Sequence, residues 1–251
     1  MRKEKKPNVI IVYADDLGYG DLSCYGGVGV KTPNVDRLLE NGVKFAEGYS
    51  TSAVCTPARY SVITGEYPFR NARTHILPGD ASCIISKEKE TLPKIFKKAG
   101  YNTAVVGKWH LGLGEDNLDW NQEISHTPND IGFDYSFIFP ATNDRVPCVY
   151  IKDRLVENLD PNDPIEVSYA DESPYDDIVT ATKNPELLRM KHSHGHNHSI
   201  VNGVGRIGYM RGGEKATWRD EDLAERFLGE VKGFITENSE EPFFMFYALH
   251  Q

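Results

Sequence analysis

Apolar and polar positions alternate along this chain in blocks that predict strands and helices in turn. Three apolar runs are typical of buried strands: residues 9–14, 103–106 and 243–249. The first run is expected to be covered on both faces of the sheet. Helices are expected at 34–40, 57–63, 92–99 and 220–238, and another strand at 43–49. This rhythm predicts an α/β fold, a mainly parallel sheet with helices on both faces.

Polar residues follow each of the three expected buried strands. Asp15 and Asp16 follow the first, Lys108 and His110 the second, and His250 the third. Because ligands of parallel α/β sheets bind at the carboxyl ends of the strands, we expect these residues at one edge of the sheet.

The stretch from about 114 to 218 differs from the rest because it is rich in Asp, Asn, Pro and Gly and has little periodicity. We interpret it as a loop-rich insertion with short strands near 135–139 and 149–155. No internal repeat or Gly/Ser linker interrupts the chain, so residues 1–251 are expected to form one catalytic domain.

Composition narrows the class of protein. The chain has 251 residues and a formal net charge of -9, which argues against a nucleic-acid partner. No apolar run is long enough to span a membrane. The basic start, MRKEKK, has no apolar signal region after it, although a signal removed earlier would leave the same sequence. An anion site in this acidic protein must be locally positive.

Three groups of residues could carry chemistry, and each also has a structural interpretation. Asp15 and Asp16 could hold a hard cation or could be a solvated turn. Cys55 stands before an expected helix, with Arg59 one turn later, or is a buried structural cysteine. Lys108 and His110 are two residues apart and could bind an anion and move a proton, or could be a surface lysine and a packed histidine.

Together these groups resemble the type I sulfatases, formylglycine-dependent enzymes with an alkaline-phosphatase-like fold. The matching segments are PNVIIVYADDLGYGDLSCYGG, TPNVDRLLENGVKF, CTPARYSVITG and GYNTAVVGKWHLG, which begin at residues 7, 32, 55 and 100. The resemblance is clear over residues 7–135 and returns at the strand that ends near His250.

The resemblance implies a mechanism. A maturation enzyme oxidises Cys55 to formylglycine, which hydrates to a gem-diol. Asp15, Asp16 and residue 55 bind calcium, in preference to magnesium. One diol oxygen attacks sulfur and the alcohol leaves; the second hydroxyl then loses its proton and expels sulfate. In the roles that the resemblance assigns, Arg59 stabilises the ionised diol, Lys108 binds a sulfate oxygen and His110 takes the proton.

The family pattern is incomplete here. In the family, a second metal-binding pair, a further lysine and an H-x-P-H pattern come after the third strand, and His250 would be the first residue of that pattern. We therefore interpret the chain as the N-terminal part of a sulfatase and expect its activity alone to be weak or absent. The resemblance implies a secreted or periplasmic protein. It favours exo-action on a terminal sulfated sugar, and the sugar is expected to be galactose or N-acetylgalactosamine.

Histidines alternate from His192 to His198. They could chelate zinc, form a polar loop or, by resemblance to bacterial glycan sulfatases, build a substrate pocket in which His194 and His196 contact the sugar. Arg206 and Arg211 could be pocket cations or surface charges.

Two other functions remain open. A phosphatase or phosphodiesterase of the same superfamily would use Ser or Thr with two zinc ions, and the CTPAR segment argues against it. The second is a non-catalytic binder of sulfated glycans. Such a protein would not need catalytic residues, so the intact Cys55, Arg59, Lys108 and His110 argue against it.

Overall fold

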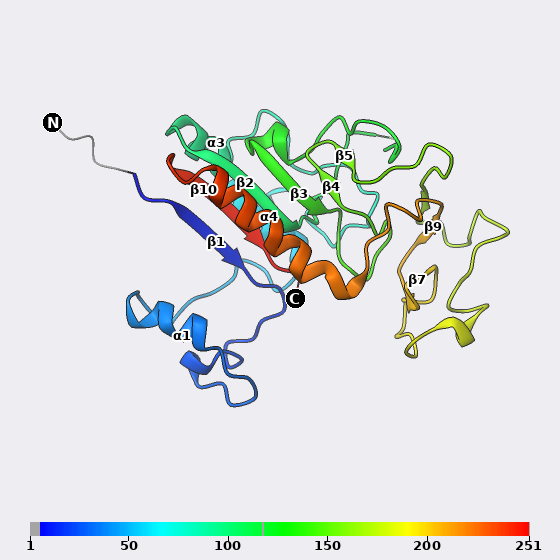
Figure 1. Cartoon of the computed structure of the whole chain (residues 1–251), viewed down its shortest axis with the longest axis horizontal. Coiled ribbons are helices and arrows are strands. Elements are labelled where there is room, and N and C mark those ends of the chain that lie inside the picture. Colours follow the sequence, from blue (N-terminus) through cyan, green and yellow to red (C-terminus); the bar gives the residue numbers. More distant parts are fainter. Residues whose placement is uncertain (1–5, 117, 251) are drawn as a thin grey trace.

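A six-stranded sheet forms the centre of the computed structural model, which describes residues 6–116 and 118–250 (Figure 1). The strand order is β1-β10-β2-β3-β4-β5. The bounds are β1 (Val9–Tyr13), β10 (Phe243–Ala248), β2 (Asn102–Lys108), β3 (Tyr135–Phe139), β4 (Ile151–Lys152) and β5 (Leu155–Val156). The first four strands in this order are parallel and the last two pair antiparallel, which confirms the mainly parallel sheet.

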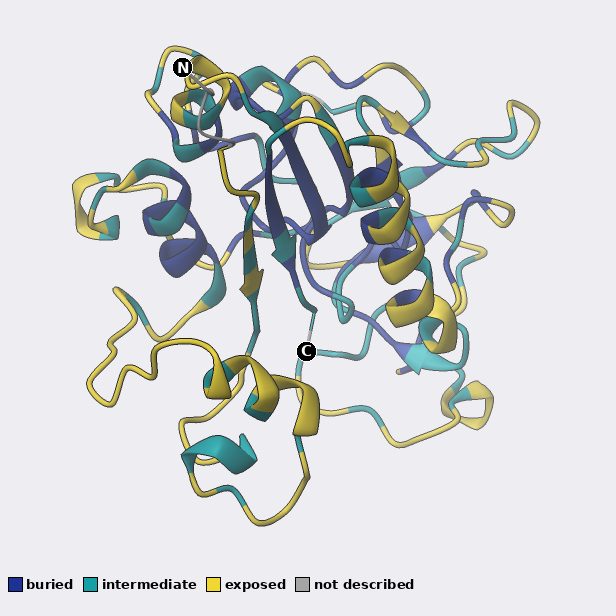
Figure 2. Ribbon diagram, turned by 60° about the vertical axis from the view of Figure 1, so that its left-hand side comes forward, coloured by how far each residue is buried: buried dark blue, intermediate teal, exposed yellow. Residues whose placement is uncertain are grey.

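Helices cover both faces of the sheet (Figure 2). On β10, Phe243 meets Phe234 of one helix, while its neighbour Phe244 stacks on Phe96 of another with ring centroids 4.2 Å apart. Successive strand residues point to opposite faces, so these helices lie on opposite sides. The α-helices are α1 (Pro33–Glu40), α2 (Cys55–Thr64), α3 (Leu92–Lys98) and α4 (Leu223–Glu237).

Short 3-10 helices and small sheets complete the described chain. The 3-10 helices are Ser23–Tyr25, Pro68–Arg70, Pro128–Ile131, Pro185–Leu187 and Asp220–Asp222. The stretch interpreted as an insertion supplies β3 to the central sheet and forms two small antiparallel sheets of its own. These pair β6 (Glu166–Ser168) with β9 (Tyr209–Arg211), and β7 (Ile200–Val201) with β8 (Val204–Gly205). The short strands expected near 135–139 and 149–155 are confirmed as β3 and the β4–β5 hairpin.

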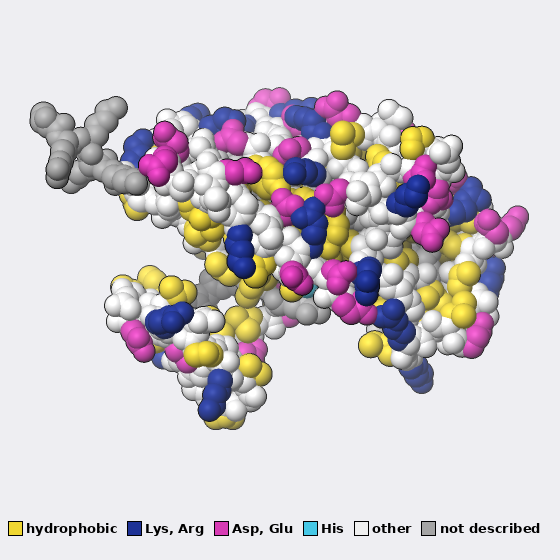
Figure 3. Space-filling model, viewed as in Figure 1, with side chains coloured by type: hydrophobic (Ala, Val, Ile, Leu, Met, Phe, Trp, Pro, Cys, Tyr) yellow, Lys and Arg dark blue, Asp and Glu magenta, His cyan; other side chains and the backbone are white. Residues whose placement is uncertain are grey.

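Two predictions for the N-terminal region are wrong. Strand β1 is not buried on both faces, because in the described chain it pairs with β10 alone and leaves Ile10 45% and Val12 60% exposed. No strand forms over residues 43–49, since that segment finds no sheet edge to pair with. The segment between β1 and α2 instead forms a lobe set apart from the body, with apolar side chains on its surface (Figure 3).

Helix α2 begins at Cys55, two residues earlier than predicted, and ends before Gly65 as expected. This places Cys55 within the first helical turn rather than ahead of it. No helix in residues 6–116 and 118–250 has the length and apolarity needed to cross a membrane.

Candidate active site

The parallel strands β1, β10 and β2 are neighbours, so their carboxyl ends meet at one edge of the sheet. Asp15 follows β1, Lys108 is the last residue of β2, and His250 follows β10. The predicted convergence of these strand ends is therefore confirmed. Gly107 makes the close approach possible, because a Cβ there would lie 1.9 Å from the Ala248 carbonyl oxygen and its φ is +109°.

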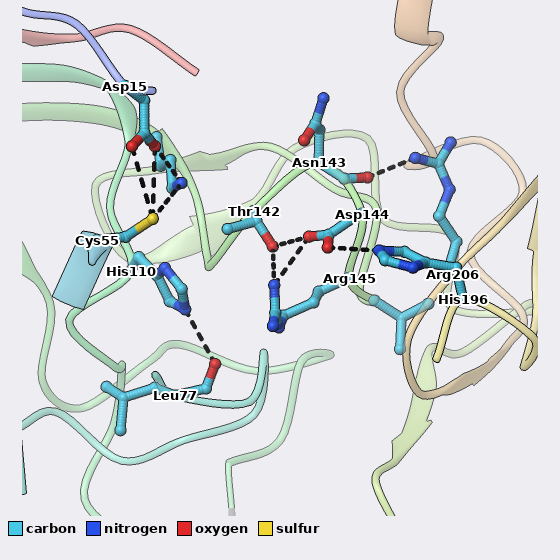
Figure 4. A network of polar contacts seen from close by, with 12 residues as sticks. Asp15, Cys55, Leu77, His110, Thr142, Asn143, Asp144, Arg145, His196 and Arg206 are labelled. Atoms are coloured by element: carbon cyan, nitrogen blue, oxygen red, sulfur yellow. Dashed lines mark hydrogen bonds and ion pairs between the residues drawn. The ribbon is translucent and has the colours of Figure 1, made fainter. Parts of the chain in front are cut away.

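Cys55 lies at the centre of this edge (Figure 4). Its Sγ is 3.5 and 3.8 Å from the two carboxylate oxygens of Asp15 and 3.1 Å from the Lys108 Nζ. As the first residue of α2, it also experiences the positive end of that helix. The next residue, Thr56, donates a 2.8 Å hydrogen bond to the His110 carbonyl and so fixes the helix start against the loop after β2.

Two buried cations pair with the carboxylate of Asp15. The Arg59 guanidinium lies 3.2 Å from Oδ2, and the Lys108 ammonium contacts the same oxygen. The three side chains are only 1%, 5% and 10% exposed for Arg59, Lys108 and Asp15. Burial alone would raise the pKa of Asp15, but the hydrogen bond and charge of Lys108, together with the charge of Arg59, lower it below its usual value. Lys108 is therefore no surface lysine.

The expected metal ligands share one cavity. Asp15, Asp16 and Cys55 all line a space of about 530 Å³, and Asp16 has a positive φ of 54°. Within residues 6–116 and 118–250, no group of three or more His, Cys, Asp or Glu side chains could hold a metal ion. The Asp15 carboxylate lies beside residue 55 and Asp16 lines the same cavity, so the oxygen donors present would fill only part of a coordination shell, whereas calcium takes about six to eight.

His110 is buried between Leu77 and Cys55 (Figure 4). Its Nε2 lies 2.9 Å from the Leu77 carbonyl oxygen, an acceptor, so Nε2 carries the proton and Nδ1 is left as an acceptor. Nδ1 is buried and has no hydrogen-bond partner among the described residues. Burial, helped by the charges of Lys108 and Arg145, lowers the pKa of His110 to about 3.

We expect this buried neutral ring to make folding stability depend on pH. The unfolded His110 binds a proton below its usual pKa of about 6.5, whereas the folded residue stays neutral to about 3. Its stabilising contribution is therefore complete above pH ~6.5 and declines as the pH falls, by about 1.4 kcal/mol per pH unit.

Urea unfolding between pH ~4 and ~7 measures this slope. His110→Gln, whose amide can still donate to Leu77, should reduce the slope by one proton. His75→Gln, at an exposed histidine, is the matched control for the loss of an imidazole. Parallel slopes for the wild type and His110→Gln would contradict the assignment.

A second cavity has a volume of about 480 Å³. Asp144, His196, Arg206 and His250 are among its lining residues. The His196 Nε2 lies 2.8 Å from the Asp144 Oδ2. His194, also predicted to contact the sugar, is exposed and does not line this cavity.

The two arginines left open by the sequence differ in burial. Arg206 is 2% exposed and pairs with Asp220 through contacts of 2.6 and 2.8 Å, at the second cavity. Arg211 is exposed and pairs with Glu166, so it is a surface charge. The alternating histidines do not converge on a zinc site within the described chain.

Thr142, Asp144 and Arg145 were not predicted as site residues. Their position contained a usable signal, because they follow β3, a strand parallel to β2, and so reach the same sheet edge. The loop-like composition around them concealed it.

A parallel sheet with a helix-borne cysteine, a carboxylate and buried cations at one edge defines an α/β protein of the alkaline-phosphatase-like class. More narrowly, the chain belongs to the sulfatase family, whose model matches residues 7–251.

Known proteins agree with this assignment. An N-acetylgalactosamine-6-O-sulfatase of Bacteroides thetaiotaomicron is 50% identical over 246 residues, covering 98% of this chain and 48% of that protein. Human steryl-sulfatase is 40% identical over 146 residues, or 56% of this chain and 24% of its own. A solved structure, reported with the metabolism of multiple glycosaminoglycans by B. thetaiotaomicron, superposes with a TM-score of 0.95 at 50% identity, covering 98% and 51% of the two chains. The chain spans about half the length of these bacterial relatives.

Proposed function

We propose that this chain is the N-terminal catalytic part of a sulfuric ester hydrolase that uses formylglycine derived from Cys55. The observation that carries the proposal is the position of the Cys55 Sγ, at the head of a helix and within 4 Å of both the Asp15 carboxylate and the Lys108 ammonium. A group at this point can react with an anionic ester whose charge is balanced by the surrounding cations.

Lys108 and Arg59 are placed for different roles in the reaction. The Lys108 Nζ, beside the Sγ of residue 55, is placed to bind an oxygen of a sulfate under attack there. Arg59 lies behind Asp15 and is also anchored by a 2.6 Å hydrogen bond to the Lys108 carbonyl. Its fixed charge favours an ionised oxygen on residue 55.

The unpaired nitrogen of His110 supports the hydrated form of residue 55. A buried ring acceptor without a donor is costly, and Figure 4 shows this ring beside Cys55. One hydroxyl of a gem-diol at position 55 can donate to Nδ1 while the other attacks sulfur. His110 then accepts the proton of the second hydroxyl as sulfate is expelled, which is the role that the resemblance predicts.

The residues of this site could supply part of the coordination shell of a metal ion. Asp15, Asp16 and residue 55 would hold it, and an oxygen-only set favours calcium over softer cations. Such an ion would polarise the sulfate and lower the pKa of the attacking hydroxyl.

The substrate class follows from the relatives and the second cavity. The bacterial relative is an N-acetylgalactosamine-6-O-sulfatase, so we infer a sulfated sugar at a glycan end as substrate here. His196 lines the cavity that would receive the sugar ring. His194 is exposed outside this cavity, where it would contact a neighbouring sugar unit of the glycan. The proposal includes a formylglycine-generating enzyme as partner and a periplasmic or secreted location.

Peptide mass mapping of residue 55, after expression of the protein at its full natural length with a maturation system, tests the proposal. An aldehyde, together with hydrolysis of 4-nitrophenyl sulfate, is the expected result. A thiol that is never converted would refute it. Hydrolysis of 4-nitrophenyl phosphate in preference to the sulfate would indicate a phosphatase, and binding of sulfated sugar without turnover would indicate a glycan-binding relative.

A further inference from the structure

The backbone of His110 has an uncommon conformation. Its φ is +56°, in the left-handed region, where the Cβ of a side chain crowds the following carbonyl oxygen. A residue keeps this conformation only where the surrounding structure holds it there. The contacts of the His110 backbone therefore decide where its ring lies beside Cys55 (Figure 4).

Three hydrogen bonds from three separate segments hold His110. Its backbone N–H donates to the Pro140 carbonyl, after β3, at 2.9 Å. Its ring Nε2 donates to the Leu77 carbonyl at 2.9 Å. Its own carbonyl accepts from the Thr56 hydroxyl, at the start of α2, at 2.8 Å. Among the polar groups of His110, only Nδ1 has no partner within the described chain, so this nitrogen is free to take a proton.

The bond from Thr56 differs from the other two because it comes from the helix that carries residue 55. Thr56 follows Cys55 in the first turn of α2, and it is fully buried. In residues 6–116 and 118–250, no other group donates to the His110 carbonyl. Loss of the hydroxyl would leave this buried carbonyl unpaired, which is unfavourable, so the loop that carries His110 would move relative to residue 55.

We propose that Thr56 is a positioning residue, which aligns the His110 ring with residue 55 for the release of sulfate. This inference rests on the proposed sulfatase function. In the release step, the O–H bond of the free hydroxyl on sulfated residue 55 breaks and its proton passes to Nδ1 of His110. The electron pair left on that oxygen forms the carbonyl of the aldehyde. The bond from carbon to the sulfate oxygen breaks, and its electron pair leaves with sulfate.

A displaced ring would slow this release without slowing the attack on sulfur. Kinetics of the full-length, converted protein with 4-nitrophenyl sulfate test this. Thr56→Val replaces the hydroxyl by a methyl group of similar size. It should lower kcat by about 30-fold, a part of the roughly 100- to 10,000-fold that general acid–base catalysis contributes. Because sulfated residue 55 accumulates, KM should fall in parallel, and kcat/KM should change by less than about threefold.

Two further observations belong to this test. Thr56→Ser, which can make the same hydrogen bond, should keep kcat within about threefold of the wild type. Thr56→Val should release a burst of about one 4-nitrophenol per active site before its slow steady rate. Peptide mass mapping gives the fraction of residue 55 that is aldehyde, and each rate is divided by it, because Thr56 is next to the modified residue. Equal loss in kcat and kcat/KM without a burst would show a general structural role and overturn the inference, and so would an unchanged kcat.

Thr103→Val provides the matched control. Thr103 is also fully buried, and its hydroxyl donates to the Gly132 carbonyl at 2.8 Å, near the amino end of β2 and away from the site. Its replacement should lower the urea midpoint of unfolding but leave kcat and KM within about twofold. Should Thr56→Val fail to fold, Thr56→Ala removes the same hydroxyl without adding a methyl group, and the same kinetic pattern is expected of it.

Nitrogen NMR of labelled histidine in the unconverted, full-length protein distinguishes failure of the inference from failure of the proposed function. His110→Gln identifies the resonances of the His110 ring. Thr56→Val should shift them, whereas Thr56→Ser and Thr103→Val should leave them in place. If the wild type cleaves no sulfate ester but Thr56→Val still shifts them, only the proposed function fails. Unchanged His110 resonances in folded Thr56→Val would overturn the inference, whatever the catalytic result.

Discussion

Replacement of Cys55 by alanine should lower kcat for 4-nitrophenyl sulfate by about 10⁵-fold, because removal of a nucleophile leaves only the binding and electrostatic contributions of the site. Cys55→Ser should behave differently. If the serine is not oxidised, its hydroxyl can take the sulfate once, but no neighbouring hydroxyl can expel it. A single turnover with a stable sulfated residue is therefore expected, visible as a mass increase on one peptide.

The matched control is Cys24→Ala. Cys24 is another half-buried free cysteine, and it lies in the 3-10 helix of the N-terminal lobe. Its replacement should leave the rate within about twofold, as for most changes away from a site. More than about 1% residual activity in Cys55→Ala would contradict covalent catalysis at this residue.

Replacement of Asp15 by asparagine should destabilise the protein and remove its response to calcium. The change leaves the buried cations Arg59 and Lys108 without their shared carboxylate, and an uncompensated buried charge costs about 3–5 kcal/mol. Urea unfolding measures this loss. Calcium at about 100 times its dissociation constant should stabilise the wild type by about 2.7 kcal/mol and the variant far less.

Asp130→Asn provides the comparison for this prediction. Asp130 forms a partly buried pair with Arg154, so its replacement should also cost stability. It should retain the calcium response and the sulfate ester hydrolysis, since it lies outside both cavities. An undiminished calcium response in Asp15→Asn would show that the ion binds elsewhere.

Much of the fold was predictable because local patterns and tertiary structure agree. The apolar runs that became β2 and β10 are covered on both faces, and continuous burial requires continuous apolarity. Strand β1 has the same kind of sequence, but its burial depends on which neighbours pair with it. Pattern alone cannot distinguish a central strand from an edge strand, so its exposure was missed.

The convergence of the candidate site residues was predictable for a related reason. Asp15, Lys108 and His110 follow strands directly, and the strand-end rule places such residues at one edge. Cys55 and Arg59 were found by the spacing of their motif. The sequence did not show that Lys108 would be almost fully buried against Asp15, because that contact joins segments 93 residues apart.

The sequence by itself determined the α/β class and the family, and it predicted which residues gather at the sheet edge, because each depends on local order along the chain. Only the tertiary structure placed His196 against Asp144, left His194 outside the cavity and set Arg145 beside His110. Those contacts arise where the segment after β3 meets the histidine-rich segment about 50 residues later. Such a meeting is decided by packing of the whole domain, which no periodicity records.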